Sequence, residues 1–164
     1  MLFRSFRYLL FAHLRPTEYE IAEVVATLRS GWLGTGPKVA AFEADFASYV
    51  GAGQALGVSS CTAALQLAIQ LLDLEPGDEV IVPSMTFVAT ANAVIHAGAT
   101  PVLADVDRDT LNLDPQQVEA LCTRRTRAVL PVHFAGRPCD MDRLMGLAKA
   151  RDLAVIEEIG RAHV

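Results

Sequence analysis

The segment EVIVPSMTFVATANAVIHAGATPVLADV, residues 79–106, decides the fold. It opens with a short apolar run over residues 79–82, which Pro83 ends, and such a run is typical of a buried strand. Residues 87–96 are interpreted as a helix with Gly98 as its C-cap. Another strand-like run follows at residues 101–106. The order strand, helix, strand predicts two parallel strands joined by a crossover helix.

The same alternation continues on both sides of this segment. Further helices are predicted at residues 18–28, 39–50, 62–72 and 141–150, and one opens at Asp114-Pro115, with Asp114 as its cap. Further strands are predicted at residues 55–58, 128–132 and 154–157. Strands this apolar must be covered on both faces, so we expect an α/β fold with a mostly parallel, doubly wound sheet.

The first two helices carry apolar residues at helical spacing. In residues 18–28 these share one face, and in residues 39–50 they are expected to point inward. The residues are Ile21, Val24, Val25 and Leu28 in the first helix and Val39, Phe42, Phe46 and Val50 in the second.

Composition excludes several classes of protein. The chain has 164 residues, which fits about one domain, and its 52% hydrophobic and 20% charged residues exclude a disordered chain. A net charge of −5 argues against a nucleic-acid partner. Three cysteines without metal-ligand spacing predict no metal site and a reducing, cytoplasmic location. No apolar run has bilayer-spanning length, so no membrane partner is expected.

Ligands of parallel sheets bind at the carboxyl ends of the strands, so the residues that follow each strand are the candidates for a site. Ser60, Cys61, Thr62 and Ala63 lead into a helix, whose free N–H groups could bind a phosphate. A plain N-cap formed by Ser60 or Thr62 is the alternative. No glycine-rich dinucleotide or triphosphate motif is present, which argues against a nucleotide-dependent enzyme of the Rossmann type.

Three other strand ends carry candidate side chains. Phe87 could cover a flat heterocycle, or it could be a core residue of the following helix. His133 could donate to a ligand or be structural. Glu157 and Glu158 could supply a carboxylate to a protonated ring nitrogen, or both could be solvated acids.

Taken together, these segments resemble the DegT/DnrJ/EryC1/StrS family of pyridoxal-phosphate-dependent sugar aminotransferases. The resemblance runs from about Arg15 to Glu157 and depends on the order and spacing of short motifs. These are SGWL at 30–33, TGP at 35–37, VSSCTAAL at 58–65, PGDEV at 76–80, PSMTFVAT at 83–90, GATPV at 98–102 and PVHFAG at 131–136.

The resemblance implies part of the large domain of the fold type I aminotransferases, with an incomplete sheet, and a homodimer. It implies transfer of an amino group from an amino acid, usually glutamate, to a keto group of a nucleotide-linked sugar. Cys61, Thr62 and Ala63, with Ser60, would hold the phosphate of pyridoxal 5′-phosphate (PLP). Phe87 would stack on its ring, and Glu158 stands where relatives have the aspartate that pairs with the ring nitrogen.

The resemblance places the Schiff-base lysine beyond residue 164. The chain contains only Lys38 and Lys149, and neither is at that position. We therefore assign no catalytic residue and expect the 164-residue chain to be inactive. Relatives with His in place of this lysine are sugar dehydratases, so that activity stays open, as does a non-catalytic binding or regulatory protein on the same fold.

The two ends of the chain depart from the family pattern. Residues 1–15 match it poorly, and residues 16–157 are expected to form the partial PLP-binding domain. Residues 158–164, EIGRAHV, are what a widely used sequencing-adapter DNA encodes in one frame, so we predict an artificial tail. The adapter would supply all but the first base of the Glu158 codon, and an Asp codon begins with the same base. We therefore expect Asp, also a carboxylate, as the natural residue at position 158. A natural, divergent end is the alternative.

Overall fold

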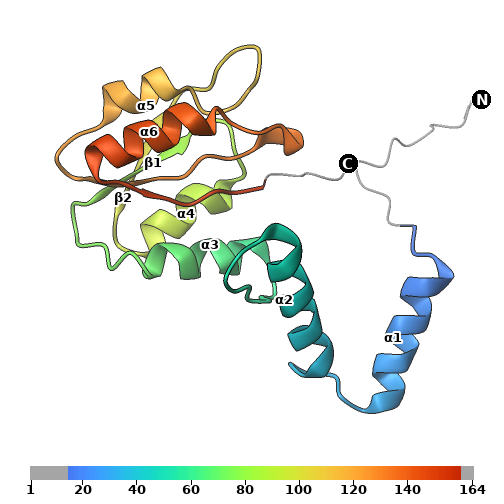
Figure 1. Ribbon diagram of the computed structural model, residues 1–164. Helices are drawn as coiled ribbons and strands as arrows, with labels where there is room; N and C mark the ends of the chain where they lie inside the picture. The colour runs from blue at the N-terminus through green and yellow to red at the C-terminus, as the bar shows by residue number, and fades with distance from the viewer. Residues whose placement is uncertain (1–14, 160–164) are drawn as a thin grey trace, which may run out of the picture. The chain divides into compact units, whose positions relative to one another are not determined.

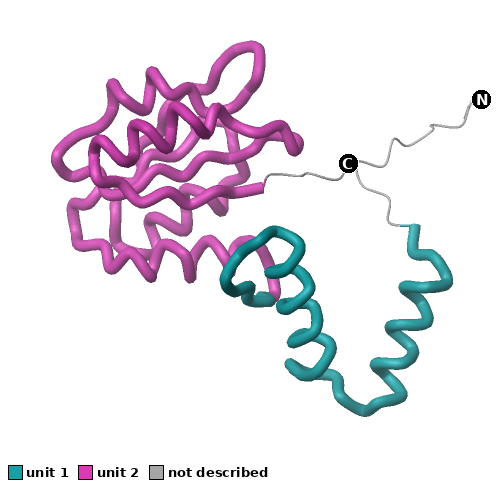
Figure 2. The backbone as a smooth tube through the Cα atoms, in the orientation of Figure 1, with its two compact units in different colours: residues 1–58 teal, residues 59–164 magenta. Residues whose placement is uncertain are grey.

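The computed structural model describes residues 15–159. Within the chain two compact units separate between residues 58 and 59 (Figure 2). The expected segments 1–15 and 158–164 lie largely outside the described residues, and only Arg15, Glu158 and Ile159 of them are described.

Unit 1 contains two helices, α1 (Glu18–Ser30) and α2 (Pro37–Val50). Thr17 begins α1 with a capping box, in which its hydroxyl accepts from the first turn while Glu20 accepts from the Thr17 N–H. Gly31 ends α1 at φ +72°, a left-handed conformation that favours glycine. Helix signals in the sequence therefore work here as expected.

The face of α2 that was predicted to point inward is not buried, and neither is the apolar face of α1. Neither α1 nor α2 contains a buried residue, and Phe42 is 59% exposed. The Phe42 and Phe46 rings contact each other, with centroids 5.9 Å apart. Inward packing was therefore wrong, because the helical period places apolar residues on one face but does not supply a surface to cover it.

Unit 2 is built on a four-stranded sheet in the order β2-β1-β3-β4, with all pairs parallel. The strands are β1 (Glu79–Pro83), β2 (Thr100–Ala104), β3 (Thr126–Val129) and β4 (Ala154–Val155). β1 and β2 align residue for residue from Glu79–Thr100 to Pro83–Ala104. The predicted parallel sheet is confirmed.

Helices cover both faces of the sheet (Figure 1). They are α3 (Cys61–Gln70), α4 (Val88–His96), α5 (Pro115–Leu121) and α6 (Met141–Arg151). A short 3-10 helix, η1 (Phe134–Gly136), follows β3 and contains no buried residue. Val80 and Val82 of β1 pack with α3 and α4, whereas Ile81 packs with α5 and α6. This alternation gives two apolar cores and confirms the doubly wound arrangement.

Several predicted bounds change in the structure. Residues 55–58 form no strand, and Leu56 is 74% exposed, because no described strand pairs with this segment. The runs predicted at 101–106, 128–132 and 154–157 end earlier. Pro131 has no N–H to continue the ladder, which resumes only as the isolated bridge Val132–Glu158.

Two smaller features complete the fold. The C-cap of α4 is Ala97 rather than Gly98, which follows at φ +82° and donates its N–H to Ile95 O at 3.0 Å. Among the described residues, no helix is long and apolar enough to cross a membrane.

Candidate functional site

The carboxyl edge of the sheet is where the predicted residues of unit 2 gather. The chain passes from β1 to β2 on one side and then to β3 on the other side of β1. This reversal makes the edge beyond β1 and β3 a topological switch point, where open α/β sheets bind ligands.

The N-terminus of α3 forms one side of this edge. Ser60 is its N-cap, and the Ser60 hydroxyl accepts from the Ala63 N–H at 3.2 Å, so the N-cap interpretation is correct. The cap leaves the first-turn N–H groups of Cys61 and Thr62 without an acceptor inside the helix. Both residues are exposed. Capping and anion binding are therefore compatible at this helix end.

Glu158 lies at the end of the chain segment that continues β4. Its N–H donates to Pro131 O at 2.9 Å, and its carbonyl accepts from the His133 N–H at 2.9 Å. The side chain is only 7% exposed. Burial raises the pKa of this carboxyl, while a hydrogen bond from Thr90 opposes the rise. The interpretation of Glu158 as a solvated acid was wrong.

Two threonines that the sequence analysis did not single out contact this carboxylate. The Thr90 hydroxyl donates to Glu158 Oε2 at 2.7 Å, and the Thr86 and Thr90 hydroxyls are 2.8 Å apart. Thr90 is fully buried in α4. Their spacing of four residues, at the start of a helix that follows a buried strand, is the signal that could have indicated them.

The Cys61 thiol is the titratable group at the N-terminus of α3. Burial, and to a lesser degree the negative charge of Glu158, raise the pKa of the thiol. This charge effect agrees with a placement of Cys61 and Glu158 at the same edge of the sheet. A raised pKa also keeps this thiol protonated and makes it a poor nucleophile.

Phe87 stands at the same edge, between Thr86 and the first turn of α4. It occupies the N-cap position without a side-chain cap, and it is 64% exposed. The alternative that placed Phe87 in the core was therefore wrong. Its ring is available to cover a ligand that binds at this edge.

His133 is held by protein groups at both ring nitrogens. Nδ1 accepts from the Cys139 N–H at 3.0 Å, and Nε2 lies 2.9 Å from Glu157 Oε2. Because Nδ1 is an acceptor here, Nε2 carries the proton and donates it to Glu157. His133 is therefore structural. Glu157 contacts this histidine, whereas the buried Glu158 contacts Thr90.

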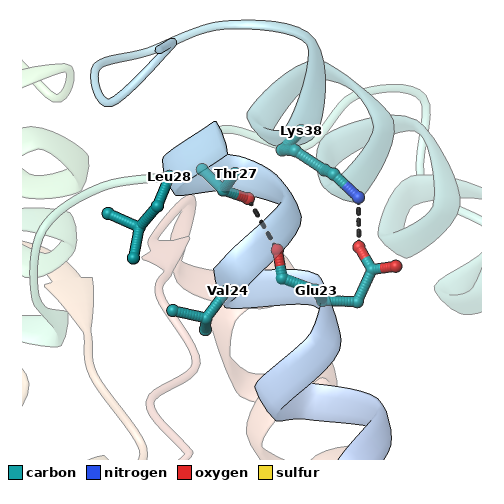
Figure 3. Close-up of a pocket in the computed structure, with 5 residues that line it drawn as sticks. All are labelled: Glu23, Val24, Thr27, Leu28 and Lys38. Atoms are coloured by element: carbon teal, nitrogen blue, oxygen red, sulfur yellow. Dashed lines mark hydrogen bonds and ion pairs between the residues drawn. The ribbon is translucent and has the colours of Figure 1, made fainter. Parts of the chain in front are cut away.

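The two lysines lie in different surroundings. Lys38 forms an ion pair with Glu23 in unit 1, beside a groove of about 270 Å³ (Figure 3). Val24, Thr27 and Leu28 also line that groove, which contains none of the carboxyl-edge residues. Lys149 is exposed in the last turn of α6, a helix that returns to the amino edge of the sheet before β4.

The described residues contain no group of three or more histidine, cysteine or acidic side chains arranged to hold a metal ion. The chemistry available at the carboxyl edge is instead that of N–H donors, hydroxyl groups and one buried carboxylate. Such a set suits an anion and a protonated nitrogen held a short distance apart.

Comparison with known families agrees with this geometry. The family model described as the DegT/DnrJ/EryC1/StrS aminotransferase family matches residues 15–164. The chain belongs to this family. It is 54% identical over 143 residues to the spore coat polysaccharide biosynthesis protein SpsC of Bacillus subtilis. The aligned region covers 87% of this chain and 37% of SpsC. The chain therefore spans little more than a third of the length of that family member.

Solved structures of aminotransferases share the fold. The aminotransferase from Psychrobacter cryohalolentis has a TM-score of 0.86 at 40% identity, covering 91% of this chain and 38% of that one. NtdA of Bacillus subtilis, solved with bound cofactor PMP, has a TM-score of 0.81 at 34% identity. The match covers 88% of this chain and 35% of NtdA. These likenesses confirm that this DegT/DnrJ/EryC1/StrS family chain has the fold of the fold type I aminotransferases.

Proposed function

We propose that the complete protein transfers an amino group from an amino acid, glutamate, to the keto group of a nucleotide-linked sugar, with PLP as cofactor. Membership of an aminotransferase family supports the reaction class. The polysaccharide role in the name of SpsC supports a sugar substrate, and PMP bound to NtdA supports the cofactor.

One observation carries this proposal, namely that a buried carboxylate, Glu158, and a helix N-terminus with free N–H groups, that of α3, both belong to the carboxyl edge of the sheet. A pyridine phosphate needs an anion site at one end and a carboxylate for its protonated nitrogen at the other. Cys61, Thr62 and Ala63, with Ser60, would hold the phosphate, Glu158 would hold the nitrogen, and Phe87 would cover the ring. When bound, the cofactor acts as an electron sink.

The protein contributes orientation and charge at this site. The dipole of α3 favours the phosphate dianion, and the Glu158 carboxylate favours the protonated ring nitrogen. The lysine amine that this chemistry requires is not assigned to Lys38 or Lys149, so we propose that it lies outside this chain and that the chain itself does not transaminate. We also propose a cytoplasmic homodimer for the complete protein.

Binding of PMP to the 164-residue chain tests the site without requiring turnover. Thr62→Asp places a negative charge at the second position of α3, where acidic residues favour the helix but repel a phosphate. Gln116→Asp makes the same change at the second position of α5 and is the matched control. Affinity is measured by fluorescence titration, with pyridoxamine as the ligand that lacks the phosphate.

We expect Thr62→Asp to weaken PMP binding by about tenfold or more and Gln116→Asp to leave it unchanged. Pyridoxamine should bind both variants equally. Absence of PMP binding, or equal weakening by both substitutions, would contradict the proposed site.

A further inference from the structure

We infer that Thr86 and Thr90 are positioning residues, whose hydroxyl groups form a chain that holds the Glu158 carboxylate in place for the ring nitrogen of the cofactor. The inference rests on the proposed function and extends it to two residues outside the expected site.

The direction of the chain follows from the number of protons. A threonine hydroxyl has one proton to donate and can also accept. Thr90 donates to Glu158 Oε2 at 2.7 Å, so the Thr86 hydroxyl must donate to Thr90 across their 2.8 Å separation. Both contacts have the short distances typical of hydroxyl hydrogen bonds. Each donor therefore strengthens the next, ending at the carboxylate.

The chain fixes one carboxylate oxygen and leaves the other available. Oε2 of Glu158 accepts from Thr90, whereas Oε1 has no hydrogen-bond partner among residues 15–159. No described buried side-chain oxygen or nitrogen lacks a partner, so Oε1 is not sealed in the core. An oxygen that is held in orientation and retains some exposure can accept from a ring N–H.

The hydroxyl chain also stabilises the charge on Glu158. No salt bridge among the described residues involves this carboxylate. The titratable group that faces it from α3 is the Cys61 thiol, and the neighbouring Glu157 is turned to His133. Hydrogen bonding from Thr90 is thus the contact that favours the ionised form in a buried position.

The inference is tested by titrating the Glu158 carboxyl with carbon-13 NMR in the full 164-residue chain, alongside PMP affinity. Thr90→Val removes the donor, Thr90→Ser retains it, and Thr86→Val removes only the distant hydroxyl. Thr126→Val is the matched control, because Thr126 is also buried and its hydroxyl contacts a different carboxylate, Glu79, at 3.4 Å.

We expect Thr90→Val to raise the pKa of Glu158 and to weaken PMP binding by about tenfold, the scale of a lost hydrogen bond to a charged group. Thr90→Ser should restore both values. Thr86→Val should shift them in the same direction by less, and Thr126→Val should shift neither. A purely structural role would lower stability in Thr90→Val and Thr126→Val alike without moving the Glu158 titration.

An unchanged Glu158 titration in folded Thr90→Val would overturn the inference, even if PMP binds the unmodified chain. If Thr90→Val does not fold, an unchanged titration in Thr86→Val has the same consequence. Failure of PMP to bind the unmodified chain, together with a raised pKa in Thr90→Val, would support the hydroxyl chain and contradict the proposed cofactor site.

Discussion

Unit 1 and unit 2 are both rich in amphipathic helices, yet among residues 15–159 a buried core is found only in unit 2. In unit 2 each helix packs on a sheet, and residues such as Ile69 and Leu144 are fully buried. In unit 1 the apolar faces of α1 and α2 contain no buried residue. The difference shows that a helical apolar stripe predicts a helix and its inner face, whereas burial needs a second surface.

The largest expected difference between the units comes from core truncation. Ile81→Ala, at a fully buried position in β1, should lower the free energy of unfolding by about 2–5 kcal/mol, because it removes apolar contacts and leaves a cavity. Phe42→Ala in unit 1 should lower it by less than about 1 kcal/mol, since the ring is largely exposed. Urea denaturation followed by circular dichroism measures both. Equal losses would contradict the contrast between the units.

Asn112 should give the next largest effect. Its buried side chain donates to Arg137 O at 3.0 Å and to Pro138 O at 2.9 Å, and it accepts from the Phe134 N–H at 2.9 Å. Asn112→Ala should cost about 2–3 kcal/mol because three backbone groups of this loop lose their partner. Asn92→Ala, at an exposed position of α4, is the control in the same assay. A small loss at Asn112 would show that water replaces these bonds.

Buried carboxylates offer a third test, because Glu79 and Glu158 in unit 2 have opposite pKa shifts. A hydrogen bond from Thr123, with further contacts from Arg125 and Thr126, lowers the pKa of Glu79, whereas burial raises that of Glu158. A carboxyl with a lowered pKa stabilises the fold at pH values above its unfolded-state pKa, and this stabilisation is lost as the pH falls through the folded-state pKa. A raised pKa costs stability that grows as the pH rises from the unfolded-state pKa to the folded-state pKa and is complete above the latter.

Glu79→Gln should therefore destabilise the protein near neutral pH, and Glu158→Gln should stabilise it there. Both effects should fade on acidification, that of Glu79→Gln as the pH falls from the unfolded-state to the lower folded-state pKa, and that of Glu158→Gln as it falls from the raised folded-state to the unfolded-state pKa. Glu23→Gln in unit 1 removes an exposed ion pair with Lys38 and should change stability by no more than about 1 kcal/mol at any pH. Thermal unfolding from pH 3 to pH 8 measures all three, and the same sign for Glu79→Gln and Glu158→Gln would contradict the assignment.

Removal of a helix cap should give the smallest difference in stability between the two units. Asp140 caps α6 by accepting from the Arg143 N–H at 3.2 Å, and Thr17 caps α1. Asp140→Ala should cost about 1 kcal/mol of global stability, because α6 unfolds together with the core of unit 2. Thr17→Ala should instead speed amide hydrogen exchange in α1 and leave unit 2 unchanged. Slower exchange of α1 than of β1 in the unmodified chain would contradict the comparison.

Local signals in the sequence predicted most elements of the fold. The caps Asp114 and Ser60 act as expected, and the apolar strands predicted the parallel sheet. The segment 55–58 was wrongly predicted as a strand. Strand formation depends on a pairing partner, which sequence periodicity does not reveal. For the same reason the exposure of Phe42 could not be predicted.

The candidate site was predictable at the strand ends but not in its side-chain contacts. Position after a strand indicated Phe87 and Glu158, because the carboxyl ends of parallel strands meet at one edge. Cys61 was indicated instead by its place in the first turn of a helix, since the strand predicted before it is absent. The contact between Thr90 and Glu158 joins residues 68 positions apart, so it depends on the packing of α4 against the sheet. The residue pattern by itself did not distinguish Glu157 from Glu158; the family resemblance singled out Glu158, and the structure shows that Glu158 is the buried one.

The most direct test of the cofactor site is a map of the backbone amide signals of the chain during titration with PMP. The account predicts saturable shifts concentrated at Cys61, Thr62 and Ala63 and at Glu158, with little change in the groove beside Lys38. Saturable shifts confined to unit 1, or none at the N-terminus of α3 when PMP is bound, would contradict the assignment of the carboxyl edge as the cofactor site.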